Sequence, residues 1–214
     1  KDINDRINSQ YQDPSIIARL FFKGKELEPS NDTLEKLEIT HGSKILAMTK
    51  PGKSYSVNRF NQVNSGWSYG PAILDGISFR ASKDIRISGV GIYKPAQQGY
   101  TLTGTVKLIQ GQSSDGEIAA TTTVEMSFSA HEKIQRVMFD KPISVRADEI
   151  WSICAELSMI GAFGFSSSYF GNNGTTTCQG EGEVTFSFLT CSESMKANQT
   201  TIYSGQIPEI YYFA

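Results

Sequence analysis

Residues 100–108 read YTLTGTVKL, a stretch in which apolar and polar side chains alternate. Its apolar members are Tyr100, Leu102, Val106 and Leu108, and threonines, a glycine and a lysine separate them. A period of two predicts a β-strand that turns one face toward a core and the other toward water. The stretch therefore predicts an antiparallel sheet with one buried face.

The same alternation recurs in later parts of the chain. It is found in Val124, Met126 and Phe128, in Trp151, Ile153, Ala155 and Leu157, and in Val184, Phe186 and Phe188. Turn-forming Gly, Asn, Asp and Ser residues separate these runs. Many short strands with such turns favour an antiparallel β-sandwich over a βαβ arrangement. We therefore predict a mainly β chain, with the sandwich at residues 55–214.

The first fifty residues have a different pattern. Ile3, Ile7 and Tyr11 recur at spacing four, which predicts a short amphipathic helix. Two β-prone runs follow, at residues 16–22 and 44–48, and we expect a turn at residues 23–25. Residues 51–54, with a proline and a glycine, have the composition of a linker. The predicted organisation is an α+β part at residues 1–50, a linker at 51–54 and the sandwich.

Charge and cysteine content limit the possible functions. Twenty Lys and Arg face 22 Asp and Glu, so the net charge of −2 offers no basic field for nucleic acid. No run of about 18 apolar residues predicts a membrane span. Three cysteines without CxxC spacing argue against a disulfide framework and a zinc site, and they favour the cytoplasm. Because the sequence begins at Lys1, we expect a piece of a longer or processed protein.

Catalytic and metal-binding signatures do not stand out. His41 and His131 have no neighbouring metal-ligand partner, and no GxSxG motif occurs. Cys154 lies in an apolar run that favours a buried, inert thiol, and Cys178 has no neighbouring residue in the sequence that would activate it as a nucleophile. We therefore predict that the chain is not an enzyme and that it holds no metal and no cofactor.

The candidate partner-binding residues are aromatic. Residues 158–174 form a long loop region in which Phe163, Phe165, Tyr169 and Phe170 stand among Gly, Ser and Asn, a mixture typical of binding loops. Phe163 and Phe165 could instead form one more strand, because they are two residues apart. Tyr169 and Phe170 are adjacent, so at least one of them should point outward if the segment is extended.

Trp67 and Tyr69 are also candidates. They lie two residues apart after Gly66 and could line the same cleft or plug one end of the sandwich. Asp75 and Arg59 could form an internal ion pair with a structural role.

The sandwich segment resembles the PHR domain, which is known from the Pam/Highwire ubiquitin ligases and from BTB-containing adaptors. The resemblance rests on six blocks in one order: 59–60, 66–69, 75–79, 85–93, 136–139 and 205–210. It departs from the family by one extra residue between Tyr69 and Asp75, and by Lys94 where a glycine is usual. It implies a compact antiparallel sandwich that binds other molecules and has no active site of its own.

Residues 19–27, 33–34 and 37–46 resemble the second half of a ubiquitin-like domain. The resemblance implies a partial β-grasp whose helix ends within residues 3–10 and whose opening hairpin is absent. The positions that match the apolar binding face of ubiquitin hold Phe21, Leu46 and Met48. These side chains could form a docking patch, or they could be buried against the neighbouring domain. No terminal Gly-Gly follows, which favours a fixed module over a conjugated modifier.

Together these observations predict a non-catalytic protein-binding module, in which the sandwich recognises a client and the ubiquitin-like part recruits components of the ubiquitin–proteasome system. The alternative is a sandwich that binds a small ligand or a carbohydrate through its aromatic loop. Nucleic acid and membrane are not expected as partners.

Overall fold

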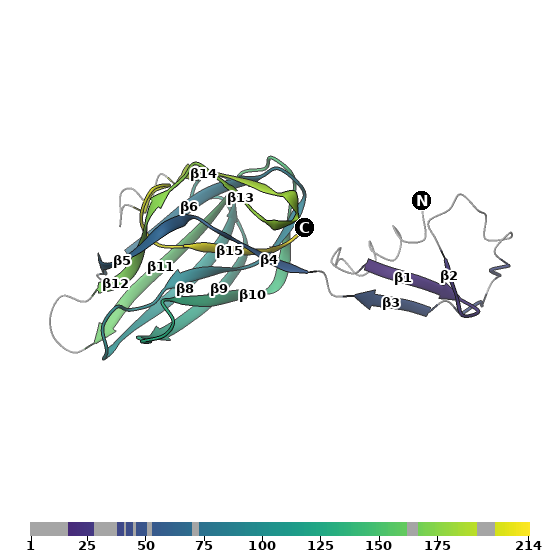
Figure 1. Cartoon of the computed structure of the whole chain (residues 1–214), viewed down its shortest axis with the longest axis horizontal. Helices are drawn as coiled ribbons and strands as arrows, with labels where there is room; N and C mark the ends of the chain where they lie inside the picture. The colour runs from purple at the N-terminus through teal and green to yellow at the C-terminus, as the bar shows by residue number, and fades with distance from the viewer. Residues whose placement is uncertain are drawn as a thin grey trace. The chain divides into compact units, whose positions relative to one another are not determined.

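The computed structural model describes residues 17–27, 38–40, 42–44, 46–50, 53–69, 73–161, 167–191 and 200–214. The chain divides into two units, Lys1–Lys53 and Ser54–Ala214 (Figure 1). The predicted helix at residues 3–11 lies outside the described residues. In the part of the chain that is described, no helix is long and apolar enough to cross a membrane.

The first unit contains a three-stranded antiparallel sheet. Its strands are β1 (Ile17–Phe22), β2 (Lys25–Leu27) and β3 (Leu46–Lys50), in the order β2-β1-β3. Lys23 and Gly24 join β1 to β2 with φ angles of 50° and 77°. Positive φ at both central positions is the geometry of a tight hairpin turn, as the sequence predicts here. The second predicted strand is displaced by two residues, from 44–48 to 46–50.

The second unit is built almost entirely from strands. They are β4 (Ser54–Asn58), β5 (Phe60–Ser68), β6 (Ile73–Ala81), β7 (Ile85–Tyr93), β8 (Tyr100–Gln110), β9 (Glu117–Ser127), β10 (Ile134–Val145), β11 (Trp151–Gly161), β12 (Ser167–Gly174), β13 (Thr177–Gln179), β14 (Thr185–Thr190) and β15 (Glu209–Phe213), with a 3-10 turn η1 at Glu181–Glu183. Six strands form one sheet in the order β13-β14-β6-β11-β8-β9, and four form another in the order β10-β7-β15-β4. β12 and β5 form a separate two-stranded ribbon, and every pairing is antiparallel.

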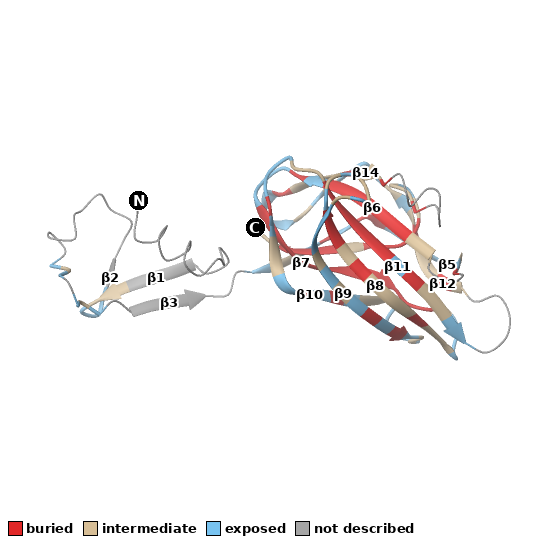
Figure 2. Cartoon of the chain, turned by 180° about the vertical axis from the view of Figure 1, so that it is seen from behind, coloured by how far each residue is buried: buried red, intermediate tan, exposed pale blue. Residues whose placement is uncertain are grey.

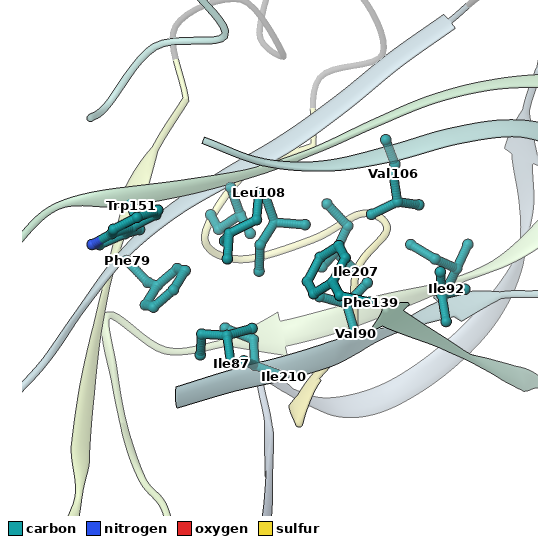
Figure 3. Close-up of a cluster of buried hydrophobic side chains, with 14 of the residues drawn as sticks. Phe79, Ile87, Val90, Ile92, Val106, Leu108, Phe139, Trp151, Ile207 and Ile210 are labelled. Atoms are coloured by element: carbon teal, nitrogen blue, oxygen red, sulfur yellow. The ribbon is translucent and has the colours of Figure 1, made fainter. Parts of the chain in front are cut away.

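The core lies between the six-stranded and four-stranded sheets. Leu102, Val106 and Leu108 are fully buried, which confirms the inward face that the alternation predicts. In Figure 3 Leu108 and Phe79 of one sheet lie across from Ile87 and Ile210 of the other. Figure 2 shows the buried residues continuing along β6 and β11. The predicted mainly β, antiparallel, sandwich-like class is therefore confirmed for this unit.

Steric crowding explains why a glycine occupies position 104, where it interrupts the alternation of residues 100–108. Gly104 has a φ of 154° and lies opposite Leu157 on β11. A Cβ atom at this position would lie 2.0 Å from the carbonyl oxygen of Glu156. A larger residue would therefore force β8 away from β11, so glycine allows the two strands to pair without interruption.

Candidate partner-binding site

The candidate site is the ribbon of β5 and β12, which lie side by side at one end of the sandwich (Figure 1). β12 is tied to the sandwich through two isolated bridges, Gly171 with Gly205 and Ser168 with Pro95. Pairing with β5 makes residues 167–174 the strand β12, so the predicted loop region 158–174 is wrong for these residues. Residues 158–161 belong to the end of β11, so the prediction of a loop is wrong for these residues too. Residues 162–166, with Phe163 and Phe165, lie outside the described residues.

Two of the predicted aromatic residues meet on this ribbon. Trp67 lies opposite Ser168, and its ring centroid is 5.3 Å from that of Phe170. Both side chains are half-buried, and Trp67 also packs against the core. The Nε1 atom of Trp67 is buried and has no hydrogen-bond partner among the described residues. The pair therefore presents a partly exposed aromatic surface.

Tyr169 precedes Phe170 on β12 and is also half-buried. The ammonium nitrogen of Lys133 lies 5.3 Å from the centre of its ring, within the range of a cation–π interaction. Because side chains alternate along a strand, Tyr169 and Phe170 project to opposite faces of β12. Lys133 thus adds a positive charge on the Tyr169 face, while Phe170 packs on Trp67.

Tyr69 has a different environment, because only 8% of it is exposed. Its hydroxyl donates a hydrogen bond of 2.8 Å to Asp75. Burial, and next the charge of Asp75, raise the pKa of Tyr69 well above its ordinary value. Tyr69 therefore lies inside the sandwich and does not line a surface with Trp67. This position corresponds to the plug, the alternative that the sequence left open.

A chain of buried polar side chains connects Tyr69 to the ribbon. Asp75 also accepts a hydrogen bond from the hydroxyl of Thr200, and Thr200 accepts one of 3.1 Å from the main-chain N–H of Gln206. Asp75, Thr200 and Gln206 are all fully buried. Buried polar groups that satisfy one another hold their segments in a fixed arrangement.

The side chain of Gln206 continues this chain to β12. Its Nε2 donates to the Ser168 hydroxyl and to the Tyr169 carbonyl, each at 2.7 Å. Its Oε1 accepts from the main-chain N–H of Tyr93 at 3.1 Å. One amide therefore joins β7, β12 and the segment before β15, directly beneath the candidate aromatic residues. Gln206 lies in a block of the PHR resemblance, but alternation along the chain did not indicate its role.

Arg59 fixes the main chain of the segment that contains Gln206. Its guanidinium donates to the carbonyl oxygens of Gln206 at 3.1 Å, Ile207 at 2.9 Å and Thr201 at 2.8 Å. Only 2% of Arg59 is exposed. These three contacts fix the main chain at residues 201–207, from which Gln206 reaches the ribbon.

The environment of Arg59 corrects the expected ion pair with Asp75. Its guanidinium lies over the Phe60 ring at 4.6 Å and the Phe188 ring at 5.2 Å, and its hydrogen bonds go to carbonyl groups. Desolvation lowers the pKa of Arg59 to about 9, while the charge of Asp75 acts weakly in the opposite direction. Arg59 thus remains protonated at neutral pH and interacts with Asp75 only at longer range.

The positions of the ubiquitin-like patch are described in part. Phe21 is half-buried and lies opposite Leu46, and Met48 lies opposite Arg19. This register brings the three predicted positions onto neighbouring parts of β1 and β3.

The residues considered for catalysis are dispersed. His131 is exposed, Cys154 and Cys191 are buried, and Cys178 is half-buried. His41 lies outside the described residues. Within the described ranges, no group of three His, Cys, Asp or Glu side chains could hold a metal ion.

A depression of about 390 Å³ lies away from the aromatic ribbon. It is lined by Arg80, Asp148, Phe188 and hydroxyl-bearing residues of β13 and β14, among others. None of the predicted aromatic residues contributes to this lining. The depression therefore gives no support to ligand binding through the aromatic loop.

The fold defines a β-sandwich module of two antiparallel sheets with an additional ribbon at one end. Residues 58–213 match the PHR domain family, and the chain belongs to this family.

Relatives of the chain include both ligases and BTB/POZ proteins. The chain is 29% identical over 167 residues to the E3 ubiquitin-protein ligase MYCBP2 of Danio rerio, covering 75% of this chain and 3% of that protein. It is 30% identical over 172 residues to the E3 ubiquitin-protein ligase highwire of Drosophila melanogaster, covering 78% of this chain and 3% of that protein. It is 28% identical over 194 residues to BTB/POZ domain-containing protein 6-A of Danio rerio, covering 83% of this chain and 34% of that protein. The chain thus spans a small fraction to about a third of these relatives.

Among solved structures, the chain is similar to one of infectious bursal disease virus Gt strain, with a TM-score of 0.33 and 10% identity. The similarity covers 80% of this chain and 39% of that one. A TM-score this low carries no argument about fold or function.

Proposed function

We propose that the PHR domain of this chain is a non-catalytic protein-binding module that recognises a client or partner in the cytoplasmic ubiquitin system. The segment is similar to parts of proteins named as ubiquitin ligases and of a BTB/POZ protein. A segment found in both kinds of protein is better explained by binding than by ligase chemistry. Three cysteines, an odd number without CxxC spacing, are compatible with a reducing compartment.

The observation that supports this proposal most is the presence of partly exposed aromatic side chains on both faces of the ribbon. Trp67, Tyr169 and Phe170 are half-buried, and the buried hydrogen bonds of Gln206 hold the strand that carries two of them. Aromatic side chains on a rigid support lose little entropy when they bind, and they dominate many protein interfaces. We include Phe163 and Phe165 among the proposed partner contacts on the basis of the sequence alone, while Tyr69 supports the ribbon from inside the sandwich.

Replacing Tyr169 and Phe170 together by alanine should reduce partner capture much more than it reduces stability. Loss of interface aromatics commonly costs about 2 kcal/mol or more, which is about thirtyfold in affinity. Affinity capture from cytoplasm with the intact chain, followed by mass spectrometry, should show ubiquitin-system proteins with the wild type and few with the double variant. Thermal melting measured in parallel should remain cooperative.

The matched control is Ile118→Ala, which removes an exposed apolar side chain from β9. This variant should capture the same proteins as the wild type. If the double variant instead unfolds, with a loss of about 3 kcal/mol or more, the rings belong to the core and the surface lies elsewhere. If both stability and capture survive, the ribbon is not the binding site.

We further propose that residues 1–50 form a ubiquitin-like part, joined by the linker 51–54, which recruits components of the ubiquitin–proteasome system through Phe21, Leu46 and Met48. Support comes from the antiparallel order β2-β1-β3 and from the register that places Phe21 opposite Leu46.

A fragment of residues 54–214 should fold alone and melt cooperatively. Ser54 is included because β4 begins there and pairs with Phe213 of β15. The buried core belongs to this segment, so the fragment retains its main source of stability. Calorimetry should give one transition close to that of the sandwich in the full chain. An aggregated fragment beside a folded full chain would show that the domain boundary is wrong.

A further inference from the structure

The outer edge of β5 is open. β5 pairs with β12 on one side, and no strand in the described ranges pairs with its other side. All six residues from 61 to 66 are exposed. An open edge presents unpaired main-chain donors and acceptors, which can template pairing with another strand.

The hydrogen bonds of β12 show which groups of β5 point outward. Gly171 exchanges two hydrogen bonds, of 2.9 and 3.0 Å, with Gly205, so its main chain points away from β5. Its neighbour across the ribbon is Val63. Gly171 and Val63 therefore form a non-hydrogen-bonded pair, in which the main-chain groups of both residues point away from the partner strand. The main-chain N–H and C=O of Val63 thus face the open edge. By the same alternation, Asn61 and Ser65 also face it.

The other edges of the two large sheets carry charges, a proline or short strands, all of which β5 lacks. β5 has a register shift of its own, but it lies at Gly66, beyond residues 61–65. β13 has three residues and β4 has five, which leaves little edge to pair. β9 carries Glu117 and Glu125, and a register shift interrupts it. β10 carries Arg136, Asp140, Lys141 and Pro142, and it too has a register shift. Charges, prolines, bulges and short strands all discourage edge pairing, whereas the nine residues of β5 contain no charge and no proline.

The sequence of the edge is complementary to itself. An antiparallel pairing centred on Val63 places this residue opposite its own copy, Asn61 opposite Ser65, and Gln62 opposite Asn64. Val63 is 38% exposed and would be covered by an identical apolar side chain. The amide side chains of Gln62 and Asn64 each donate and accept, so they can hydrogen-bond to one another. Because no residue of β5 is charged, the symmetric pairing brings no like charges together.

We propose that a second copy of this chain pairs with the open edge of β5, so that two ribbons join into one four-stranded sheet around a two-fold axis through Val63. Two-fold symmetry is the commonest arrangement for identical chains and requires a self-complementary surface. The paired stretch is short compared with a stable interface of about 1,600 Å², so the dimer is weak and concentration-dependent. This association goes beyond the proposed recognition of a partner.

Sedimentation velocity of the intact chain, at about 10 to 500 μM, should show the mass rising from 23.6 kDa toward twice that value. Val63→Lys should remain at the monomer mass, because the two-fold axis would place two ammonium groups together. Thr121→Lys, at an exposed position of β9, adds the same charge elsewhere and should associate like the wild type. The melting temperatures of both variants should stay within about 3 °C of the wild type.

A mixture of variants gives the sharpest test. Val63→Glu alone should also remain monomeric, but an equal mixture of Val63→Lys and Val63→Glu should recover the dimer, because opposite charges then face each other across the axis. A wild type that stays monomeric throughout this range would overturn the proposal. So would a Val63→Lys variant that associates as well as Thr121→Lys. If Val63→Lys loses a protein partner while the wild type is always monomeric, the edge accepts a foreign strand and self-pairing is refuted.

Discussion

Arg59→Met should lower the free energy of unfolding by about 3 kcal/mol, one of the two largest effects that we expect from a single substitution. Methionine keeps much of the length of the side chain but leaves the carbonyls of Thr201, Gln206 and Ile207 without the donors that now satisfy them. Leaving a buried group unsatisfied costs about 1 to 3 kcal/mol, and the relief from burying a cation offsets part of the total. Chemical denaturation at neutral pH, where Arg59 is protonated, measures the loss.

Two further variants separate the causes of this effect. Arg59→Lys keeps the charge but cannot spread its donors over three carbonyls or lie flat over Phe60, so most of the loss should remain. Arg146→Met removes a guanidinium from an exposed position and should change stability by less than about 0.5 kcal/mol. If Arg59→Met is as stable as the wild type, the contacts of Arg59 are not what holds residues 201–207 in place.

The core of the sandwich could be predicted from the sequence because its signal is local. Leu102, Val106 and Leu108 alternate with polar residues over a few positions, and each one is buried. A strand with one face in a core carries that period wherever it lies in the sequence. The predicted turn at Lys23 and Gly24 depends on a similarly short stretch.

The aromatic site could be predicted only in part, because its arrangement depends on distant segments. Trp67 and Phe170 were separate candidates, and the register of β5 against β12 brings them together. β5 itself shows little alternation, since residues 61–66 are nearly all polar, so its strand depends on pairing with β12. Gln206 acts through contacts with residues more than thirty positions away. No periodic pattern reports such contacts.

Tyr69 and Trp67 differ in burial although they are two residues apart. The chain leaves β5 after Ser68, so the two residues no longer share one strand and one face. The side chain of Tyr69 points into the core, where Asp75 accepts a hydrogen bond from its hydroxyl. The partly exposed Trp67 remains on the ribbon. A hydrogen bond to a buried carboxylate thus holds Tyr69 in the core, whereas Trp67 stays partly exposed.

Asp75→Ala should therefore have the second large effect, a loss of about 3 kcal/mol in the free energy of unfolding. The change leaves the buried hydroxyls of Tyr69 and Thr200 without their acceptor, and Thr200 in turn positions Gln206 through its main-chain N–H. Asp75→Asn keeps an acceptor oxygen of the same shape and should lose less, about 1 kcal/mol. The exposed control Asp140→Ala should be within about 0.5 kcal/mol of the wild type.

Hydrogen exchange tests whether this loss of stability reaches the candidate site on β12. The main-chain N–H of Tyr169 donates a hydrogen bond of 3.1 Å to the carbonyl of Lys94, and the carbonyl of Tyr169 accepts one from the side chain of Gln206. In Asp75→Ala the Tyr169 amide should exchange faster than can be explained by the drop in global stability, while the amide of Ile87 in the core should follow global unfolding alone. Partner capture should fall with the protection of Tyr169, because a loosened β12 must be ordered again on binding. Equal acceleration at both amides would mean that Asp75 stabilises the whole sandwich and does not preferentially support the ribbon.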